Sequence, residues 1–375
     1  MHLADNFDLP GGVLGGVIIG ATSSALLFFT GRIAGISSIV EGILIADEQD
    51  DKEWTPSFVL GLMSAGVLLN HAKPDVFGSD LKSLALKPAT IVVAGLLTGF
   101  GARLGNGCTS GHGVCGLPRR SPRSLLAVLT FMTTGAITAY LTRETALADI
   151  VYQHGTVVEP EGIFVRWFPS ILTLGAVATL FNRKFILNKL FFRRKAAEPS
   201  TAEQKPLVSS PQQTRPGIQR QNSSFKELPV HFQDYLIPFA SAFAFGIGLG
   251  LSGMCNRERV LKFLDFTGSG GFDPTLIGVM GGGVLVNLVT FHLMHIHQVA
   301  DLKMDAHPDN LKIDWRLVLG SAIFGVGWGL GGMCPGPGLV SLGASIKSAS
   351  IFVPALMVGM VKKDFLFGKG LQRFN

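Results

Sequence analysis

The cysteines of this 375-residue chain occupy a recurring position, at the end of a glycine-rich apolar segment. The three segments read GLLTGFGARLGNGCTSGHGVCG, FGIGLGLSGMC and FGVGWGLGGMC, and together they hold all the cysteines of the protein, Cys108, Cys115, Cys255 and Cys334. Free cysteine is a small hydrophobic residue that is common in buried sites, so packing alone would explain any one of them. The matching positions of Cys108, Cys255 and Cys334 instead predict thiols that act together.

A thiol at the start of a short helix suits a soft anion. The N–H groups of the first helical turn are unsatisfied and carry the positive end of the helix dipole, and the thiol adds a weak S–H donor. We therefore predict a binding site for a sulphur-bearing anion such as thiosulfate, sulfide or a persulfide. Its predicted members are Cys108, Cys255, Cys334, Cys115, His112, Asn106, Thr109, Ser110, Asn256 and Pro335.

Some of these residues leave other interpretations open. Cys115 could be a packing residue, and the ring of His112 could be satisfied by a backbone partner. Cys108, His112 and Cys115, with the two distant cysteines, also form a soft ligand set of the kind that copper(I) or zinc prefers. The spacing is loose for a structural zinc site, so we predict no metal site and no cofactor. Soft-metal transport stays as an alternative function.

The composition indicates which elements must position these residues. The chain is 47% hydrophobic and only 15% charged, whereas soluble proteins are about 25% charged. Its 47 glycines lie largely inside apolar runs, where they favour close helix contact in lipid. This predicts an all-α integral membrane protein surrounded by a lipid bilayer. The basic excess gathers in Pro118–Arg123, Arg183–Lys226 and Val361–Arg373 and forms no nucleic-acid-binding face, so nucleic acid is not a predicted partner.

Apolar segments of about 20 residues can span a bilayer, and we predict about nine transmembrane helices. They lie near residues 12–30, 55–71, 88–105, 124–141, 167–185, 234–253, 273–297, 315–332 and 349–361. Four shorter segments are interpreted as re-entrant half-helices, Gly31–Leu44, Cys108–Leu117, Cys255–Phe266 and Cys334–Ile346. Irregular backbone at membrane depth needs protein or a water-filled cavity around it, so these segments predict a shared central cavity.

The order of spans and half-helices repeats, which divides the chain into four parts. They are an N-terminal transport half at 10–145, a connecting transmembrane helix at 146–190, a disordered cytoplasmic linker at 191–233 and a C-terminal transport half at 234–365. The linker is rich in Pro, Ser, Gln and charge, and cannot form a core. Placing the basic segments inside gives the two halves opposite orientations. Such inverted repeats are typical of transporters with broken helices. The plasma membrane is the predicted location, with an organellar membrane as the alternative.

The motifs GNGCTSGHGVCGLPR, GLGLSGMCNRERVLKFLD and GVGWGLGGMCPGPGLV resemble the YeeE/YedE sulphur-transport family, over roughly 10–145 and 235–365. The resemblance implies inverted halves whose short helices meet at a constriction. It also implies import of thiosulfate or a related compound, passed by S–H hydrogen bonding along Cys108, Cys255 and Cys334. The forms GHGVCG and MCPGP are similar to a two-subunit branch of the family, here fused into one chain.

Soluble-enzyme motifs such as the phosphate-binding Walker A sequence, GxSxG and HExxH do not occur in the sequence. We therefore predict a transporter, passive or ion-coupled, and not an enzyme. The predicted partner is a small inorganic sulphur anion, and a homodimer stays open. A membrane thiol enzyme that handles persulfide sulphur is the alternative from another class.

Overall fold

The computed structural model describes residues 3–4, 7–44, 54–78, 86–145, 147–152, 235–267, 271–296 and 313–367. These residues form helices and connecting turns, with two isolated β-bridges and no β-sheet among them. The predicted all-α fold class is confirmed. The linker at 191–233 and nearly all of the connecting segment at 146–190 lie outside the described residues, and the division into four parts stays a prediction.

The helices follow the order that the sequence predicts. The N-terminal half contains α1 (Leu9–Thr30), α2 (Ile36–Leu44), α3 (Thr55–Ala72), η1 (Pro74–Phe77), α4 (Pro88–Leu104), η2 (Thr109–Gly116), α5 (Pro122–Glu144) and α6 (Ala148–Val151). The C-terminal half contains α8 (Ile237–Leu251), α9 (Arg257–Leu264), α10 (Thr275–Ile296), α11 (Trp315–Gly331), α12 (Pro335–Gly343) and α13 (Lys347–Phe367). Short helices α2, η2, α9 and α12 lie where the half-helices are predicted, and their re-entrant course in the membrane stays a prediction. The predicted span at 167–185 lies outside the described residues, and each of the others coincides with a helix.

Four stretches of the described residues are long and apolar enough to cross a membrane. They are α1, α5 as far as Arg143, α10, and the run Trp315–Gly343 that contains α11 and α12. A fifth is the pair α4 and η2, which is bent by 48° at a short break. Apolar side chains such as Leu14, Leu129 and Leu285 are more than half exposed on these helices, as lipid-facing surfaces require. The protein is therefore a multi-pass integral membrane protein, and the total of about nine spans stays a prediction.

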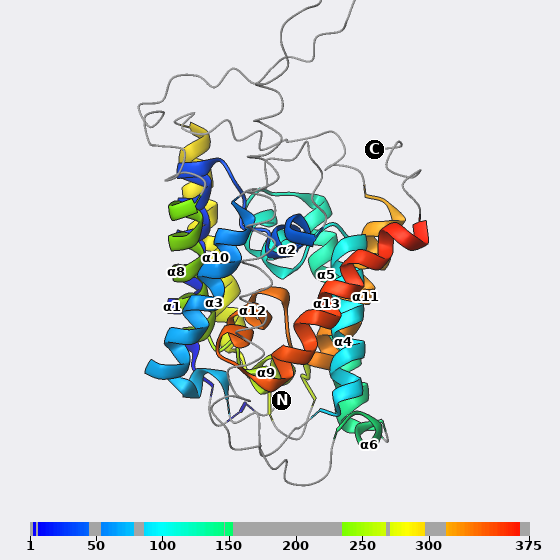
Figure 1. The fold of residues 1–375 in the computed structure, drawn as a ribbon. Coiled ribbons are helices and arrows are strands. Elements are labelled where there is room, and N and C mark those ends of the chain that lie inside the picture. The colour runs from blue at the N-terminus through cyan, green and yellow to red at the C-terminus, as the bar shows by residue number, and fades with distance from the viewer. Residues whose placement is uncertain are drawn as a thin grey trace, which may run out of the picture.

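The long helices form two groups, with short helices between them (Figure 1). One group contains α1, α3, α8 and α10, and the other contains α4, α5, α11 and α13. The packing is reciprocal: α1 packs on α10 as α3 packs on α8, and α4 packs on α13 as α11 packs on α5. Each group therefore combines helices from both halves of the chain, so the centre is built by the two halves together. The inverted orientation of the halves stays a prediction.

Glycines allow the backbones of these helices to touch. A Cβ atom at Gly20 of α1 would lie 2.8 Å from the Gly283 carbonyl oxygen of α10, and one at Gly16 would collide with the Val279 carbonyl. Small residues at a helix interface permit this close approach in a membrane, where packing drives association. The high glycine content of the apolar runs therefore serves helix contact.

We expect Asp314→Ala to destabilise the start of α11. Asp314 is the N-cap residue, and its carboxylate accepts a hydrogen bond of 3.0 Å from the Leu317 N–H. Loss of such a cap costs about 1 kcal/mol, so the thermal unfolding temperature of the purified protein should fall. Asp314→Asn keeps an oxygen acceptor and should lose less. Equal loss in the two variants would contradict the capping role.

Candidate functional site

The starts of three short helices meet at the centre of the protein. Cys108 is the N-cap of η2 and Cys334 is the N-cap of α12, both with extended backbone. The Thr109 hydroxyl donates a hydrogen bond of 3.5 Å to the Cys334 sulphur. The Ile36 N–H at the start of α2 donates to the Ser110 hydroxyl over 3.2 Å, and that hydroxyl lies 3.2 Å from the Cys108 sulphur. Two thiols and two hydroxyls from distant segments therefore share one centre.

A cavity opens beside these residues. Its lining combines the helix starts with apolar side chains of α1, α8 and α10, namely Ile19, Ile36, Cys108, Thr109, Ser110, Val114, Phe245, Leu249, Met254, Val279, Met280, Pro335, Gly336 and Pro337. The cavity volume is about 20 Å³, room for about one water molecule. The centre is thus nearly closed in this conformation. Pro335 starts α12 as the sequence predicts.

Cys115 lies near the same centre. It is buried, and its thiol interacts with the Ser23 hydroxyl of α1 and with the backbone of Ala34. Cys108 is close enough to interact electrostatically with both Cys115 and Cys334. The structure thus brings together three of the four predicted thiols. All four cysteines are free and buried.

His112 is satisfied by two partners. Its Nε2 lies 3.2 Å from the Gly105 carbonyl oxygen, and its Nδ1 lies 3.2 Å from the Ser124 hydroxyl. A carbonyl only accepts, so these partners assign the proton to Nε2 and make Nδ1 the acceptor from Ser124. The ring thus ties the turn after α4 to the start of α5 and holds η2 between them.

Asn287 of α10 is a site residue that sequence analysis missed. It is fully buried, and its amide nitrogen donates a hydrogen bond of 2.8 Å to the Val114 carbonyl of η2. Its amide oxygen accepts from Ser23 over 3.0 Å and from Ser24 over 2.7 Å. A buried polar side chain of this kind joins transmembrane helices. The signal in the sequence is one asparagine inside the apolar run GGGVLVNLVT.

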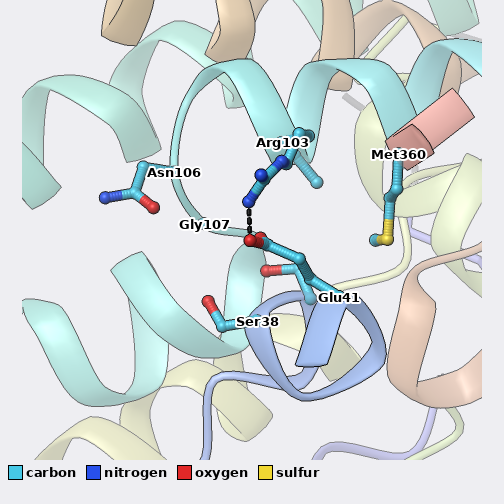
Figure 2. A pocket seen from close by; sticks show the side chains of 8 residues that line it. Ser38, Glu41, Arg103, Asn106, Gly107 and Met360 are labelled. Carbon is cyan, nitrogen blue, oxygen red and sulfur yellow. Dashed lines mark ion pairs between the residues drawn. The ribbon is translucent and has the colours of Figure 1, made fainter. Parts of the chain in front are cut away.

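Asn106 and Asn256 are outside the group of side chains that forms this centre. Asn106 lines a second pocket with Ser38, Glu41 and Arg103 (Figure 2). Asn256 is the N-cap of α9, and its side chain accepts a hydrogen bond of 3.0 Å from the Glu258 N–H. Neither residue is among the described residues that line the cavity beside Cys108. Their predicted role in substrate binding stays a prediction.

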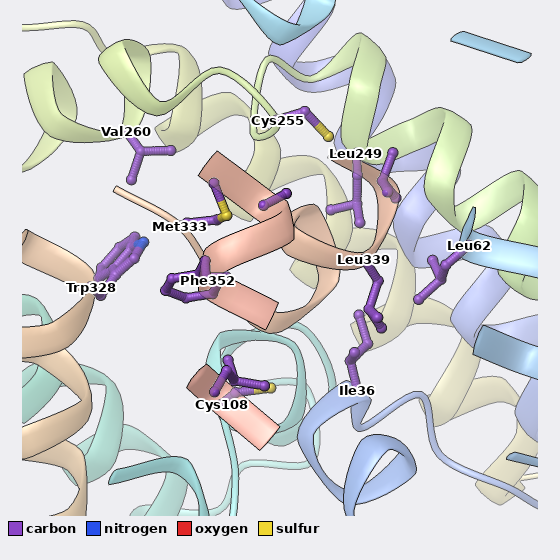
Figure 3. Packing of buried hydrophobic residues seen from close by; sticks show 14 of the residues in the cluster. Ile36, Leu62, Cys108, Leu249, Cys255, Val260, Trp328, Met333, Leu339 and Phe352 are labelled. Carbon is purple, nitrogen blue, oxygen red and sulfur yellow. The ribbon is translucent and has the colours of Figure 1, made fainter. Parts of the chain in front are cut away.

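Cys255 is also separate from the other thiols. Its thiol interacts with the Ser341 hydroxyl, which lies in α12. Figure 3 shows the side chains of Cys255 and Cys108 apart from each other. The preceding residue, Met254, lines the central cavity. Cys255 is therefore near one wall of the centre but outside the group formed by Cys108, Cys115 and Cys334.

Cysteine and histidine side chains can also bind a metal ion when several of them lie close together. In the part of the chain that the structure describes, no group of three or more His, Cys, Asp or Glu residues lies close enough together to hold a metal ion. The near neighbours of the clustered thiols are instead hydroxyl groups, from Ser23, Ser110 and Thr109. The described centre thus offers S–H and O–H groups to a ligand.

In this protein, apolar spans surround short helices that start at buried polar groups. This architecture is typical of membrane transport proteins with broken helices. Comparison with known proteins agrees with this class. Residues 9–138 match the family described as sulphur transport, and residues 234–373 match a family of unknown function, DUF6691. The chain belongs to the YeeE/YedE family of sulphur transporters, and the predicted family membership is confirmed.

Curated relatives support the same conclusion. A probable transporter of Xylella fastidiosa strain Temecula1 is 39% identical over 146 residues, which are 38% of this chain and 98% of the relative. A second probable transporter of that strain is 44% identical over 127 residues, 34% of this chain and 90% of the relative. A probable transporter of strain 9a5c is 40% identical over 131 residues, 35% of this chain and 89% of the relative. Each match thus covers nearly all of the relative but little more than a third of this protein, which is a membrane transporter.

Proposed function

We propose that the protein carries a small sulphur-containing anion, thiosulfate or a related species, through a passage lined by thiols. The observation that carries the proposal is the contact between Thr109 and the Cys334 sulphur. It brings the starts of η2 and α12 together and places Cys334 close to Cys108. In this proposal the membrane is the plasma membrane, and the protein moves its substrate without converting it.

The residues of the centre divide into two kinds of donor. The thiols are weak, polarisable donors that suit the terminal sulphur of thiosulfate. The hydroxyls of Thr109 and Ser110 are stronger donors that suit its oxygens. At the start of α12, Pro335 and Pro337 have no N–H group, and the Gly338 N–H is bonded to the Cys334 carbonyl over 2.8 Å. Gly336 therefore supplies the N–H that the first turn of α12 offers to an anion.

The thiols form a sequence of stations in the proposal. Cys255 receives or releases the ion at the Ser341 side of α12, and Cys334 and Cys108 hold it at the centre. Cys115 lies beyond Cys108, near Ser23. Passage requires the centre to widen, because its cavity holds about one water molecule. Met254 and Met280 line that cavity, and their unbranched, flexible side chains are suited to move aside.

Reconstituted liposomes test this function directly. We expect the purified protein to take up ³⁵S-thiosulfate into sealed liposomes, above the level of protein-free liposomes and in competition with unlabelled thiosulfate. The label should remain in thiosulfate after uptake, as chromatography of the liposome contents can show. Uptake equal to that of protein-free liposomes, under inward anion, proton and sodium gradients, would remove the proposal.

The same preparation separates the alternatives. If the protein is a membrane thiol enzyme, thiosulfate is consumed without net flux. One cysteine then becomes a persulfide, and the mass of the intact protein rises by about 32 Da, the mass of one sulphur atom. A soft-metal transporter predicts copper or zinc that copurifies and is lost when Cys108 is replaced by serine. Either result, with no thiosulfate flux, would replace the proposed function.

A further inference from the structure

A second pocket lies next to the thiol centre and is lined by charged and polar residues (Figure 2). Its polar lining comes from the first two turns of α2, the end of α4 and the turn before Cys108, and consists of Ser37, Ser38, Glu41, Arg103, Asn106 and Gly107. Two chain segments connect it to the centre. In one, Ile36 lines the thiol cavity and Ser37 lines the polar pocket; in the other, Cys108 lines the cavity and Gly107 lines the pocket.

The charges of this pocket form an ion pair in a poorly hydrated place. Arg103 and Glu41 bind each other, and their side chains are only 13% and 19% exposed. A guanidinium group binds planar and tetrahedral oxyanions as readily as it binds a carboxylate, because its N–H groups form a rigid fork. Glu41 therefore occupies the position on Arg103 that an oxyanion would take.

An independent observation concerns Ser37. Ser37 is 4% exposed and lines the same pocket. Among the described residues its hydroxyl has no hydrogen-bond partner. A buried hydroxyl without a partner is costly and needs a reason. A bound oxyanion supplies one, because it accepts from the hydroxyl and from the guanidinium together.

We propose that this pocket is a second anion station, in which an oxyanion displaces Glu41 from Arg103 and accepts a hydrogen bond from Ser37. Glu41 then acts as a tethered competitor that occupies Arg103 while no anion is bound. The pocket has a free volume of about 0 Å³ in this conformation, so Glu41 must swing away to make room for the anion. Gly107 of the station directly precedes Cys108 in the chain, so the station adjoins the thiol centre. The purpose of the station rests on the proposed transport function. Its ability to bind anions is independent of that function.

Equilibrium binding to the purified full-length protein tests the proposal, with ³⁵S-sulfate and ³⁵S-thiosulfate as probes at low ionic strength. Removing the competing charge in Glu41→Gln should tighten binding of both probes by about three- to tenfold, as expected for one lost charge contact. Arg103→Gln, and the double variant Glu41→Gln with Arg103→Gln, should bind neither probe at this station. Ser37→Ala in the Glu41→Gln background should weaken binding again.

The matched control is Glu258→Gln, which removes a carboxylate from an ion pair with Lys262 on the short helix α9. It should leave binding of both probes unchanged. Gel filtration and thermal unfolding establish that each variant is folded. Unchanged binding in Glu41→Gln, or a double variant that binds as tightly as Glu41→Gln alone, would overturn the proposal.

The two probes keep the station and the transport function distinguishable. Sulfate binding that responds to Glu41 and Arg103 supports the station even if liposomes take up no thiosulfate. Conversely, thiosulfate uptake together with sulfate and thiosulfate binding that ignores both residues would overturn the station and leave the transport proposal in place.

Discussion

Replacing Cys108 with alanine is expected to lower the rate of thiosulfate uptake into liposomes by about tenfold or more, and Cys334→Ala should do the same. Each variant removes a donor to a charged ligand, and such hydrogen bonds contribute about 1.5–3 kcal/mol, which corresponds to roughly ten- to a hundredfold. Both residues sit at a helix start in the shared centre, joined through Thr109. Uptake should be measured as an initial rate at equal protein incorporation.

Two further variants sharpen this result. Cys108→Ser keeps a donor of similar size and should retain more uptake than Cys108→Ala. Ser350→Ala is the control and should behave as the wild type, because the bond that the described residues give the Ser350 hydroxyl is to the Ile346 carbonyl just before the start of α13, over 3.3 Å. Folded Cys108→Ala and Cys334→Ala proteins with wild-type uptake would contradict a passage that depends on thiols.

Cys255 makes the order of effects informative. Its thiol lies against Ser341, apart from the centre, so Cys255→Ala should reduce uptake less than Cys108→Ala. If Cys255→Ala lowers uptake as much as Cys108→Ala, then the thiol beside Ser341 matters as much for passage of the ion as the thiols at the centre.

The overall helix pattern was readable from the sequence because local composition determines it. Glycine-rich apolar runs that end at a break, such as the one before Cys334, predict a long helix followed by a short one, and α11 and α12 follow that pattern. Pro335 sits at the first position of α12, as proline chemistry favours. Fold class and family follow from these local signals.

The equivalence of the three cysteines was readable only in part. Cys108 and Cys334 precede the second short helix of their halves, η2 and α12, whereas Cys255 precedes the first short helix of its half, α9. The counterpart of α9 is α2, which follows a segment without cysteine. The reciprocal packing of the halves brings like positions together, so Cys108 meets Cys334 and Cys255 does not. Which cysteines meet could therefore be predicted from the order of the short helices, but not from the repeated motif alone.

The polar partners of the site were not readable, because they join residues that are distant in the sequence. Nothing local marks Arg103 and Glu41 as partners, since they are brought together by the packing of α2 against α4. The same holds for Ser23 and Asn287, which meet only because α1 packs along α10. Such pairs depend on how helices face one another, which hydropathy patterns do not specify.

The Asn287→Leu variant should combine a loss of stability with a loss of uptake. Leucine has the same number of side-chain heavy atoms as asparagine, branched at the same carbon, so the change removes the hydrogen bonds and keeps the branched skeleton. It leaves the Val114 carbonyl and the hydroxyls of Ser23 and Ser24 without the amide that now bonds to them. Buried groups that lose a partner cost about 1–3 kcal/mol, toward the lower end in membranes. We expect a lower thermal unfolding temperature in detergent.

Transport should suffer in the same variant, because Val114 belongs to η2 and lies between His112 and Cys115. Releasing its carbonyl from α10 frees η2 to shift, which displaces Cys115 and the cavity wall that Val114 forms. We expect uptake to fall by about tenfold, the size of effect expected for one lost polar contact at the site. Thr98→Val is the matched control: Thr98 is equally buried, but the partner of its hydroxyl among the described residues is the Ala94 carbonyl of its own helix, over 2.7 Å. If both variants reduce stability and uptake to the same degree, burial of a polar group explains the loss, and Asn287 has no particular role in holding η2 at the centre.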